Sequence, residues 1–199
     1  ERIINFLTKK DLGVRIEFVD NPNYALSNGI SVLSASKTLA DKSFVLLMSD
    51  HVFQHETLAK LIANPNPDWA CTLAVDYKLS TIFDMDDATK VVANNKGEIE
   101  QIGKELTYYN AVDSGMFLAT SELFNALELA KNAEGNCSLS DGIKILAAAH
   151  KMGTMDIGNA FWQDVDTPPT LAYAEKYLFN ACRKKTDGFI SRNFNRHIS

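Results

Sequence analysis

Short runs of apolar residues alternate along the chain with segments in which apolar residues recur every three or four positions. Apolar runs bounded by turn formers are typical of buried strands, and the three-to-four spacing is typical of helices with one buried face. The pattern predicts strands at 14–19, 44–49, 69–77, 111–119, 155–158 and 160–166, and a hairpin of strands 90–93 and 98–102. It predicts helices at 1–10, 27–39, 54–63, 138–151 and 167–185, and one more that Ser121 caps.

The order of these elements predicts the fold class. Strands alternate with helices in the first half of the chain, and the hairpin is inserted midway. This order is typical of an α/β fold in which helices cover a mixed, mainly parallel sheet. A length of 199 residues is enough for one domain with a full core.

Composition narrows the classes of function. The formal net charge is −5, and no basic run occurs before the last twenty residues, so we expect no general nucleic-acid binding. The three cysteines, Cys71, Cys137 and Cys182, are widely spaced and form no CxxC pair. We expect them to be reduced and mostly buried, as in a cytoplasmic protein. GxSxG, HExxH and P-loop motifs are absent from the sequence.

Two carboxylates stand where predicted strands end. Asp50 follows the apolar run 44–48, and Asp166 ends the strand 160–166 directly before a helix. If both strands run the same way in one sheet, these side chains meet at its carboxyl edge, where open α/β sheets bind ligands. Paired carboxylates there suit Mg²⁺, whose coordination phosphate oxygens complete. Asp50 alone is equally suited to capping the helix that follows it, and for Asp166 alone capping is the favoured interpretation.

Residues beside this pair have two interpretations each. Asp164 points to the same strand face as Asp166, where it either supports the metal or is a solvated charge. His51 has no second histidine at ligand spacing, which argues against zinc, and we place it and His55 at the surface or behind the metal ligands.

A strand break and a lysine are further candidates for ligand binding. Gly115, in the segment Asp113-Ser114-Gly115, marks either a β-bulge or a place where a ligand approaches the backbone. Lys104 follows Gly103 in a polar connection, where it either reaches a phosphate or is solvated.

Four short segments, taken in order, resemble the sugar-phosphate nucleotidyltransferases. They are Asn-Tyr-Ala-Leu-Ser-Asn-Gly-Ile-Ser-Val at 23–32, Ser49-Asp50-His51, Asp113-Ser114-Gly115, and the segment 162–168. The resemblance covers residues 1 to about 185. The tail 187–199 looks like the entry to a CDP-alcohol phosphatidyltransferase membrane domain. Together they are similar to the bifunctional inositol-1-phosphate cytidylyltransferase / di-inositol-phosphate-phosphate synthase family.

The resemblance implies a fold, an activity and a location. The fold would be a three-layer Rossmann-like domain over residues 1–185, followed by a linker at 186–199 into a membrane domain. The activity would be Mg²⁺-dependent formation of CDP-inositol and pyrophosphate from CTP and inositol 1-phosphate. The domain would be cytoplasmic and tethered to the membrane.

The resemblance also assigns roles to individual residues. It implies two Mg²⁺-binding and catalytic aspartates, Asp50 and Asp166. It implies nucleotide-binding residues, namely Ser27, Asn28, Ser31 and Ser49. It implies acceptor-binding residues, namely Lys104, Asp113, Gly115 and Asp141.

The chain departs from the family pattern at one place. The opening strand and glycine-rich loop that bind the triphosphate are absent from this sequence, so we expect an N-terminally truncated domain that is inactive alone. Three alternatives remain: another nucleotide or acceptor, such as a hexose phosphate or phosphocholine; a non-catalytic regulatory domain of the same fold; and a glycosyltransferase. The last is disfavoured because Val52 stands where an Asp-x-Asp motif needs its second aspartate.

Overall fold

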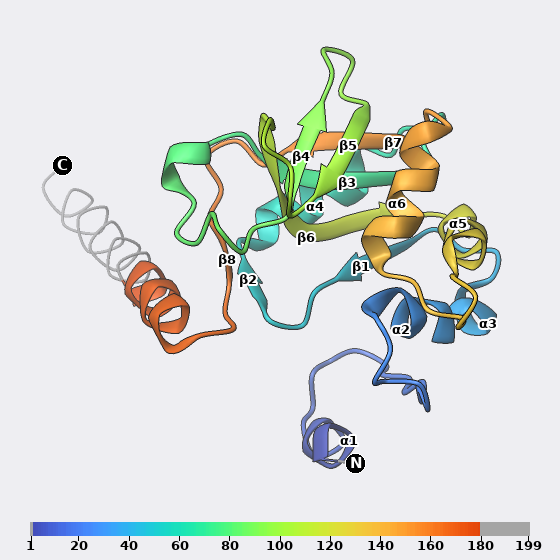
Figure 1. The fold of residues 1–199 in the computed structure, drawn as a ribbon. Helices are drawn as coiled ribbons and strands as arrows, with labels where there is room; N and C mark the ends of the chain where they lie inside the picture. The colour runs from blue at the N-terminus through green and yellow to red at the C-terminus, as the bar shows by residue number, and fades with distance from the viewer. Residues whose placement is uncertain (1, 180–199) are drawn as a thin grey trace, which may run out of the picture.

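A six-stranded sheet forms the centre of the structure, a computed structural model that describes residues 2–179 (Figure 1). Five strands follow the order β5-β4-β6-β3-β7, and β1 also pairs with β6. Their bounds are β1 Phe44–Leu47, β3 Cys71–Asp76, β4 Lys90–Ala93, β5 Ile99–Gly103, β6 Ala111–Ala119 and β7 Met152–Asp156. The predicted α/β class and the hairpin β4–β5 are confirmed.

The strand directions differ from the mainly parallel sheet that the sequence predicts. Among the described strands, only β3 and β7 pair in parallel. The long strand β6 lies between β3 on one side and β1 and β4 on the other, and it runs opposite to all three. Because one reversed strand takes part in three pairings, and β4 and β5 form a hairpin, most pairings of this mixed sheet are antiparallel.

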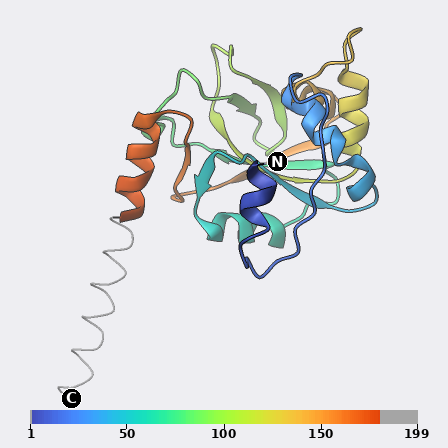
Figure 2. The same cartoon turned by 90° about the horizontal axis from the view of Figure 1, so that it is seen from below.

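Helices cover both faces of the sheet and make three layers. On one face, α2 (Asn28–Ser34), α5 (Glu122–Ala130) and α6 (Leu139–Ala148) pack on the larger core cluster. On the other face, Leu61 of α4 (His55–Ala63) packs with Ala74 and Met116. Successive strand residues point to opposite faces, so Met116 belongs to one cluster and Phe117 to the other. Figure 2, seen from below, separates the two helical layers.

A second, two-stranded sheet lies beside the first and carries candidate site residues. Strand β2 (His51–Phe53), which the sequence pattern did not predict, pairs antiparallel with β8 (Trp162–Asp164). The predicted strand 160–166 is therefore shorter than expected. The predicted strand 155–158 is also shifted, to 152–156, because Met152 is fully buried and pairs with Cys71 of β3.

The N-terminal segment contains the one clear error of element type. Residues 14–19 alternate as a strand should, but they form no strand and pair with no other strand among the described residues. Val14 and Phe18 are exposed, so no core face selects an extended conformation here. The predicted helix 1–10 is observed as α1 (Arg2–Leu7), and the helix 27–39 is split at Ala35 into α2 and α3 (Ser36–Leu39).

The remaining predictions concern the cysteines and the last helix. Cys71 and Cys137 are free and buried, as expected, and Cys182 lies outside the described residues. A short 3₁₀ helix, η1 (Leu79–Thr81), follows β3, and the last helix begins at residue 168 and continues to 179, where the described chain ends. The linker expected at 186–199 also lies outside the described residues. No helix in residues 2–179 is long and apolar enough to span a bilayer.

Candidate functional site

A cavity of about 420 Å³ opens where the two sheets meet. Its walls come from the end of β3, the middle of β6, β2 and β8, the start of α6, the loop 77–89 and the helix that begins at residue 168. Six of the site residues expected from the sequence line it: Asn28, Asp50, Lys104, Asp113, Gly115 and Asp166. Residues from segments far apart in the sequence thus converge on one space.

Four carboxylates gather at one end of the cavity. Oxygen or nitrogen atoms of Asp50, His51 and Asp164 lie within 4.8 Å of one another, and so do those of Asp87, Asp164 and Asp166. Asp164 is the shared member, so it joins Asp50 to Asp166. The backbone supports this arrangement, because the N–H of Val165 donates to the carbonyl of Asp50 over 2.9 Å.

The surroundings of Asp164 disfavour its charged form. Burial raises its pKa; His51 lowers it, and the carboxylates of Asp166, Asp50 and Asp87 raise it further. Its Oδ1 is buried and has no hydrogen-bond partner among the described residues. A buried carboxylate oxygen without a donor costs free energy that a bound cation would remove. The cluster therefore has the donor set of a site for a divalent metal.

His51 is fixed on three sides at this end of the cavity. Its Nδ1 donates to the carbonyl of Ser114 over 2.9 Å, and its ring stacks on Trp162 with centroids 5.6 Å apart. Its Nε2 faces Asp164 at 3.7 Å, which is too long for a hydrogen bond. The imidazole is thus a packed neighbour of the carboxylates.

Asp113 lies on β6 beside this cluster. Burial raises the pKa of Asp113 to about 6, although the hydrogen bond from Gly115 N and the nearby His51 both lower it. The Gly115 N–H donates to Asp113 Oδ1 over 2.7 Å. Strand β6 is continuous here, but its register against β3 shifts between Asp113 and Phe117.

Lys104 has a partner that the sequence did not suggest. Its Nζ donates to Asp87 Oδ1 over 2.6 Å, and both side chains are about half exposed. An exposed pair of this kind contributes little to stability, about 0–1 kcal/mol, so an anionic ligand can exchange for Asp87. Lys104 therefore stands next to the acidic end as an available cation.

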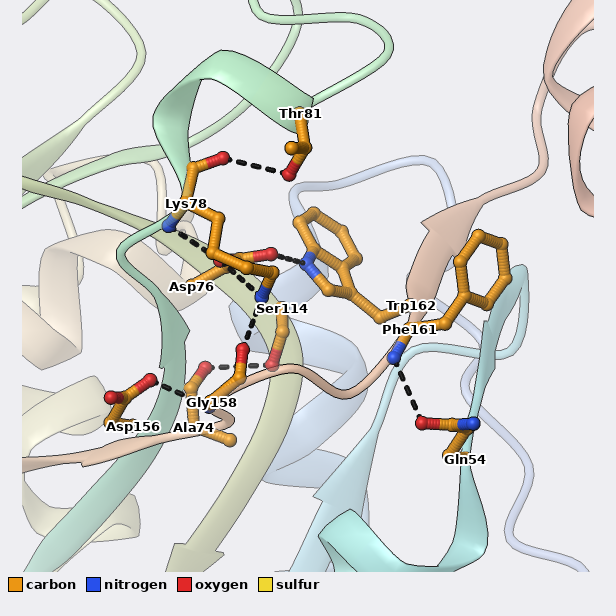
Figure 3. A network of polar contacts seen from close by, with 10 residues as sticks. All are labelled: Gln54, Ala74, Asp76, Lys78, Thr81, Ser114, Asp156, Gly158, Phe161 and Trp162. Atoms are coloured by element: carbon orange, nitrogen blue, oxygen red, sulfur yellow. Dashed lines mark hydrogen bonds and ion pairs between the residues drawn. The ribbon is translucent and has the colours of Figure 1, made fainter. Parts of the chain in front are cut away.

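A second polar group lines the cavity at the end of β3 (Figure 3). Asp76 accepts hydrogen bonds from Lys78 N at 2.7 Å and Lys78 Nζ at 2.8 Å. Its other oxygen accepts from Trp162 Nε1 at 3.0 Å, and Lys78 Nζ also donates to the carbonyl of Gly158. Sequence reasoning missed these residues, although Asp76 ends an apolar strand and Asp50 was singled out for its place after an apolar run.

Aromatic side chains close one side of the cavity. Phe161 stacks on Tyr177 with centroids 3.7 Å apart, and Phe83 stacks on Tyr173 at 4.6 Å. Gln54 ties this group to β2, because it accepts from Phe161 N at 3.0 Å and donates to Tyr177 OH at 3.2 Å. The helix that begins at residue 168 is thereby held against the cavity.

The other expected site residues lie outside the cavity lining. Ser27 N donates to Asn136 Oδ1 over 2.9 Å, and Ser31 Oγ accepts from Asn21 over 2.9 Å. Asp141 forms a capping box with Ser138 at the start of α6, and these hydrogen bonds lower its pKa. Ser49 is also outside the lining. The nucleotide-binding and acceptor-binding roles implied for these four residues remain predictions.

Comparison with known proteins relates the chain to nucleotidyltransferases. It is 31% identical over 191 residues to the bifunctional IPC transferase and DIPP synthase of Aquifex aeolicus, which covers 96% of the chain and 42% of that protein. It is 32% identical over 195 residues to the protein of the same name from Thermococcus kodakarensis, covering 94% and 41%. No protein-family model matches the chain.

Solved structures give the same relationship. The inositol-1-phosphate CTP transferase from T. maritima superposes with a TM-score of 0.72 at 26% identity, over 85% of this chain and 65% of that one. A structure described as a glucose-1-phosphate thymidylyltransferase from Bacillus anthracis has a TM-score of 0.72 at 15% identity, over 88% and 70%, and shows the shared fold alone. The chain spans about two-fifths of the length of the curated relatives it matches. The resemblance noted from the four sequence segments is confirmed.

Proposed function

We propose that this chain, which belongs to the sugar-phosphate nucleotidyltransferases, contributes the IPC transferase activity named in its relatives. The reaction is transfer of a cytidylyl group from CTP to inositol 1-phosphate, which yields CDP-inositol and pyrophosphate. The observation that carries the proposal is the set of carboxylates around Asp164. These carboxylates lie in the same cavity as Lys104.

The acidic end fits a divalent cation. Asp50 and Asp166 would hold Mg²⁺ together with Asp164, whose buried Oδ1 has no other partner among the described residues. When bound, Mg²⁺ neutralises phosphate charge and fixes the orientation of phosphate groups. Of the two interpretations of Asp164, we therefore adopt the one in which it supports the metal.

The residues of the cavity then position the acceptor. Lys104 would release Asp87 and bind the phosphate of the acceptor. Asp113 and Gly115 would lie beside the inositol ring. An oxygen of that phosphate forms a bond to the α-phosphorus of CTP as the bond from the α-phosphorus to the bridging oxygen breaks, and pyrophosphate leaves. The attacking oxygen is already ionised, so the chain supplies positioning and charge compensation in place of a general base.

The nucleotide would approach along α2. Asn28 lines the cavity, and its Oδ1 accepts from Leu139 N over 2.8 Å, which ties α2 to α6. We place Ser27, Ser31 and Ser49 near the nucleotide as well. Because the sequence holds no glycine-rich phosphate loop, we infer that the 199-residue chain alone turns over slowly or not at all.

A substrate panel tests the proposal. The protein is expressed from its coding sequence with the adjoining regions included, and pyrophosphate release is measured with CTP, UTP or GTP against inositol 1-phosphate, glucose 1-phosphate or phosphocholine. Release with CTP and inositol 1-phosphate, dependent on Mg²⁺, supports the proposal. Release only with another pair identifies a different nucleotidyltransferase, and no release with any pair favours a non-catalytic domain.

We extend the proposal to the DIPP synthase named second in the relatives' names, which we assign to a membrane domain. The chain would be the cytoplasmic nucleotide-transferring part of a protein with a fused membrane domain. Cell fractionation of the protein expressed with its adjoining regions tests this placement. Recovery in the membrane fraction is expected, and recovery only in the supernatant would contradict it.

A further inference from the structure

We propose that the ion pair of Asp76 and Lys78 binds the hydroxyl groups of the acceptor ring and selects a polyol phosphate over acceptors without such a ring. The inference rests on the proposed function, and it assigns to that site a specificity-determining pair that the family resemblance did not supply. Neither residue belongs to the acidic cluster around Asp164.

The pair is rigidly built at the wall of the cavity. The side chain of Asp76 is 4% exposed, and that of Lys78 is 32% exposed. Asp76 accepts three hydrogen bonds, two from Lys78 and one from Trp162 Nε1. Thr81 Oγ1 in turn donates to the carbonyl of Lys78 over 2.9 Å, which holds the backbone of the loop that carries the lysine (Figure 3). Such a lysine loses little further freedom when it binds a ligand.

One donor of Lys78 remains for a ligand. An ammonium group has three N–H donors. Two of those on Lys78 Nζ are used, by Asp76 Oδ1 and by the carbonyl of Gly158. Lys78 lines the cavity and is partly exposed, so the third donor is accessible to an oxygen of a bound molecule.

Trp162 separates this pair from the acidic end of the cavity. Its indole N–H contacts Asp76, while its ring stacks on His51, which neighbours Asp50 and Asp164. The cavity thus has polar groups at two ends of one flat aromatic side chain. A small cyclic phosphate matches this layout when its phosphate lies at the acidic end beside Lys104, its ring lies along the indole, and its far hydroxyls reach Lys78.

The charge of the pair favours neutral hydroxyls. Asp76 and Lys78 together carry no net charge, and Asp76 is buried next to the lysine. A second phosphate at this position would meet the Asp76 carboxylate as well as the ammonium group. A hydroxyl can accept from Lys78 without that repulsion. The pair therefore suits a polyol monophosphate.

Calorimetric titration of the chain with two ligands in the presence of Mg²⁺ tests the inference. Inositol 1-phosphate carries the ring, and inorganic phosphate carries only the group expected beside Lys104. Substitution Lys78→Met should weaken inositol 1-phosphate binding about tenfold and leave phosphate binding within about twofold, since a hydrogen bond from a charged donor is lost. The control Lys96→Met removes an exposed lysine at the β4–β5 turn, outside the cavity, and should change neither.

A second variant guards against misfolding. Lys78→Met leaves the buried Asp76 without its ion-pair partner, so the double variant Asp76→Asn/Lys78→Met removes both charges and keeps an acceptor for Trp162. If this folded double variant binds inositol 1-phosphate as tightly as the wild type, or loses both ligands equally, the inference is wrong. If the wild-type chain binds phosphate no more weakly than inositol 1-phosphate, the inference is also wrong while the phosphate site stands. Failure of both ligands to bind the wild-type chain would count against the proposed function itself.

Discussion

The imidazole of His51 fills the space that a side chain at position 115 would need. A Cβ on Gly115 would lie 2.3 Å from His51 Nδ1, and the φ angle of Gly115 is +76°. Both facts require glycine here, because side chains rarely adopt this φ and no Cβ fits. The close approach places His51 against β6 and beside two carboxylates, Asp50 directly before β2 and Asp164 on β8.

Replacement of Gly115 by alanine should therefore destabilise the fold strongly. We expect Gly115→Ala to lower the free energy of unfolding by about 2 kcal/mol or more, from backbone strain and from displacement of His51. Gly135 is a matched control, since its φ is +75° but nothing lies within 4 Å of its Cβ position. Urea denaturation of Gly115→Ala and Gly135→Ala measures how much the clash with His51 adds to the backbone strain. Equal losses in the free energy of unfolding would show that the clash adds nothing.

The raised pKa of Asp113 predicts a pH-dependent stability. The pKa is about 6 in the folded chain, against 3.8 for an ordinary carboxyl, chiefly because of burial. The folded state therefore favours the protonated form, and its contribution to stability is lost as the pH rises through about 6. Asp113→Asn, which keeps an acceptor for Gly115 N, should be more stable than the wild type by about 1–3 kcal/mol at pH 7.5. Denaturation at several pH values checks this, and an advantage that persists unchanged at pH 4 would contradict it.

Asp141 caps the start of α6, and its substitution distinguishes this structural role from a role in binding the acceptor. Its Oδ2 accepts from Ser138 N at 3.0 Å and Ser138 Oγ at 2.7 Å, at the start of α6. Asp141→Ala should lower the free energy of unfolding by about 1 kcal/mol at neutral pH. Since the hydrogen bonds lower its pKa, this contribution should disappear as the pH falls through that lowered value.

The same variant tests the acceptor-binding role predicted for Asp141. If Asp141 only caps α6, the affinity for inositol 1-phosphate stays unchanged in Asp141→Ala, as in the exposed control Asp41→Ala. A selective loss of affinity in Asp141→Ala would instead support contact with the acceptor.

Most buried strands and helices could be predicted from the sequence because the spacing of their apolar residues reflects the face that each element buries. The apolar run that includes Phe117 identified β6, and Gly115 marked the irregularity in its pairing with β3. The segment 14–19 failed because alternation shows what a strand would bury but does not supply a partner strand. The antiparallel direction of β6 could not be predicted from the sequence either, because it depends on which strands lie on either side of it.

The site was predictable only in part for a similar reason. Asp50 and Asp166 were found because each stands at the end of a strand predicted from the sequence, and they line the same cavity. Asp164 was noted as a neighbour, but its position between them depends on the pairing of β2 with β8, which brings His51 opposite Asp164. The Asp76–Lys78 pair has a visible sequence signal, a carboxylate at a strand end, that becomes informative only once β3 is placed at the cavity.

The rate of pyrophosphate release after substitution of Asp50 tests the central claim most directly. The protein expressed with its adjoining regions is assayed with CTP, inositol 1-phosphate and Mg²⁺ as wild type, as Asp50→Ala and as the control Asp86→Ala, which changes an exposed residue outside the cavity lining. We predict a loss of about a hundredfold or more for Asp50→Ala, because the metal-binding carboxylates lose a member, and a near wild-type rate for the control. A wild-type rate in Asp50→Ala would contradict the assignment of nucleotidyl transfer to this cavity.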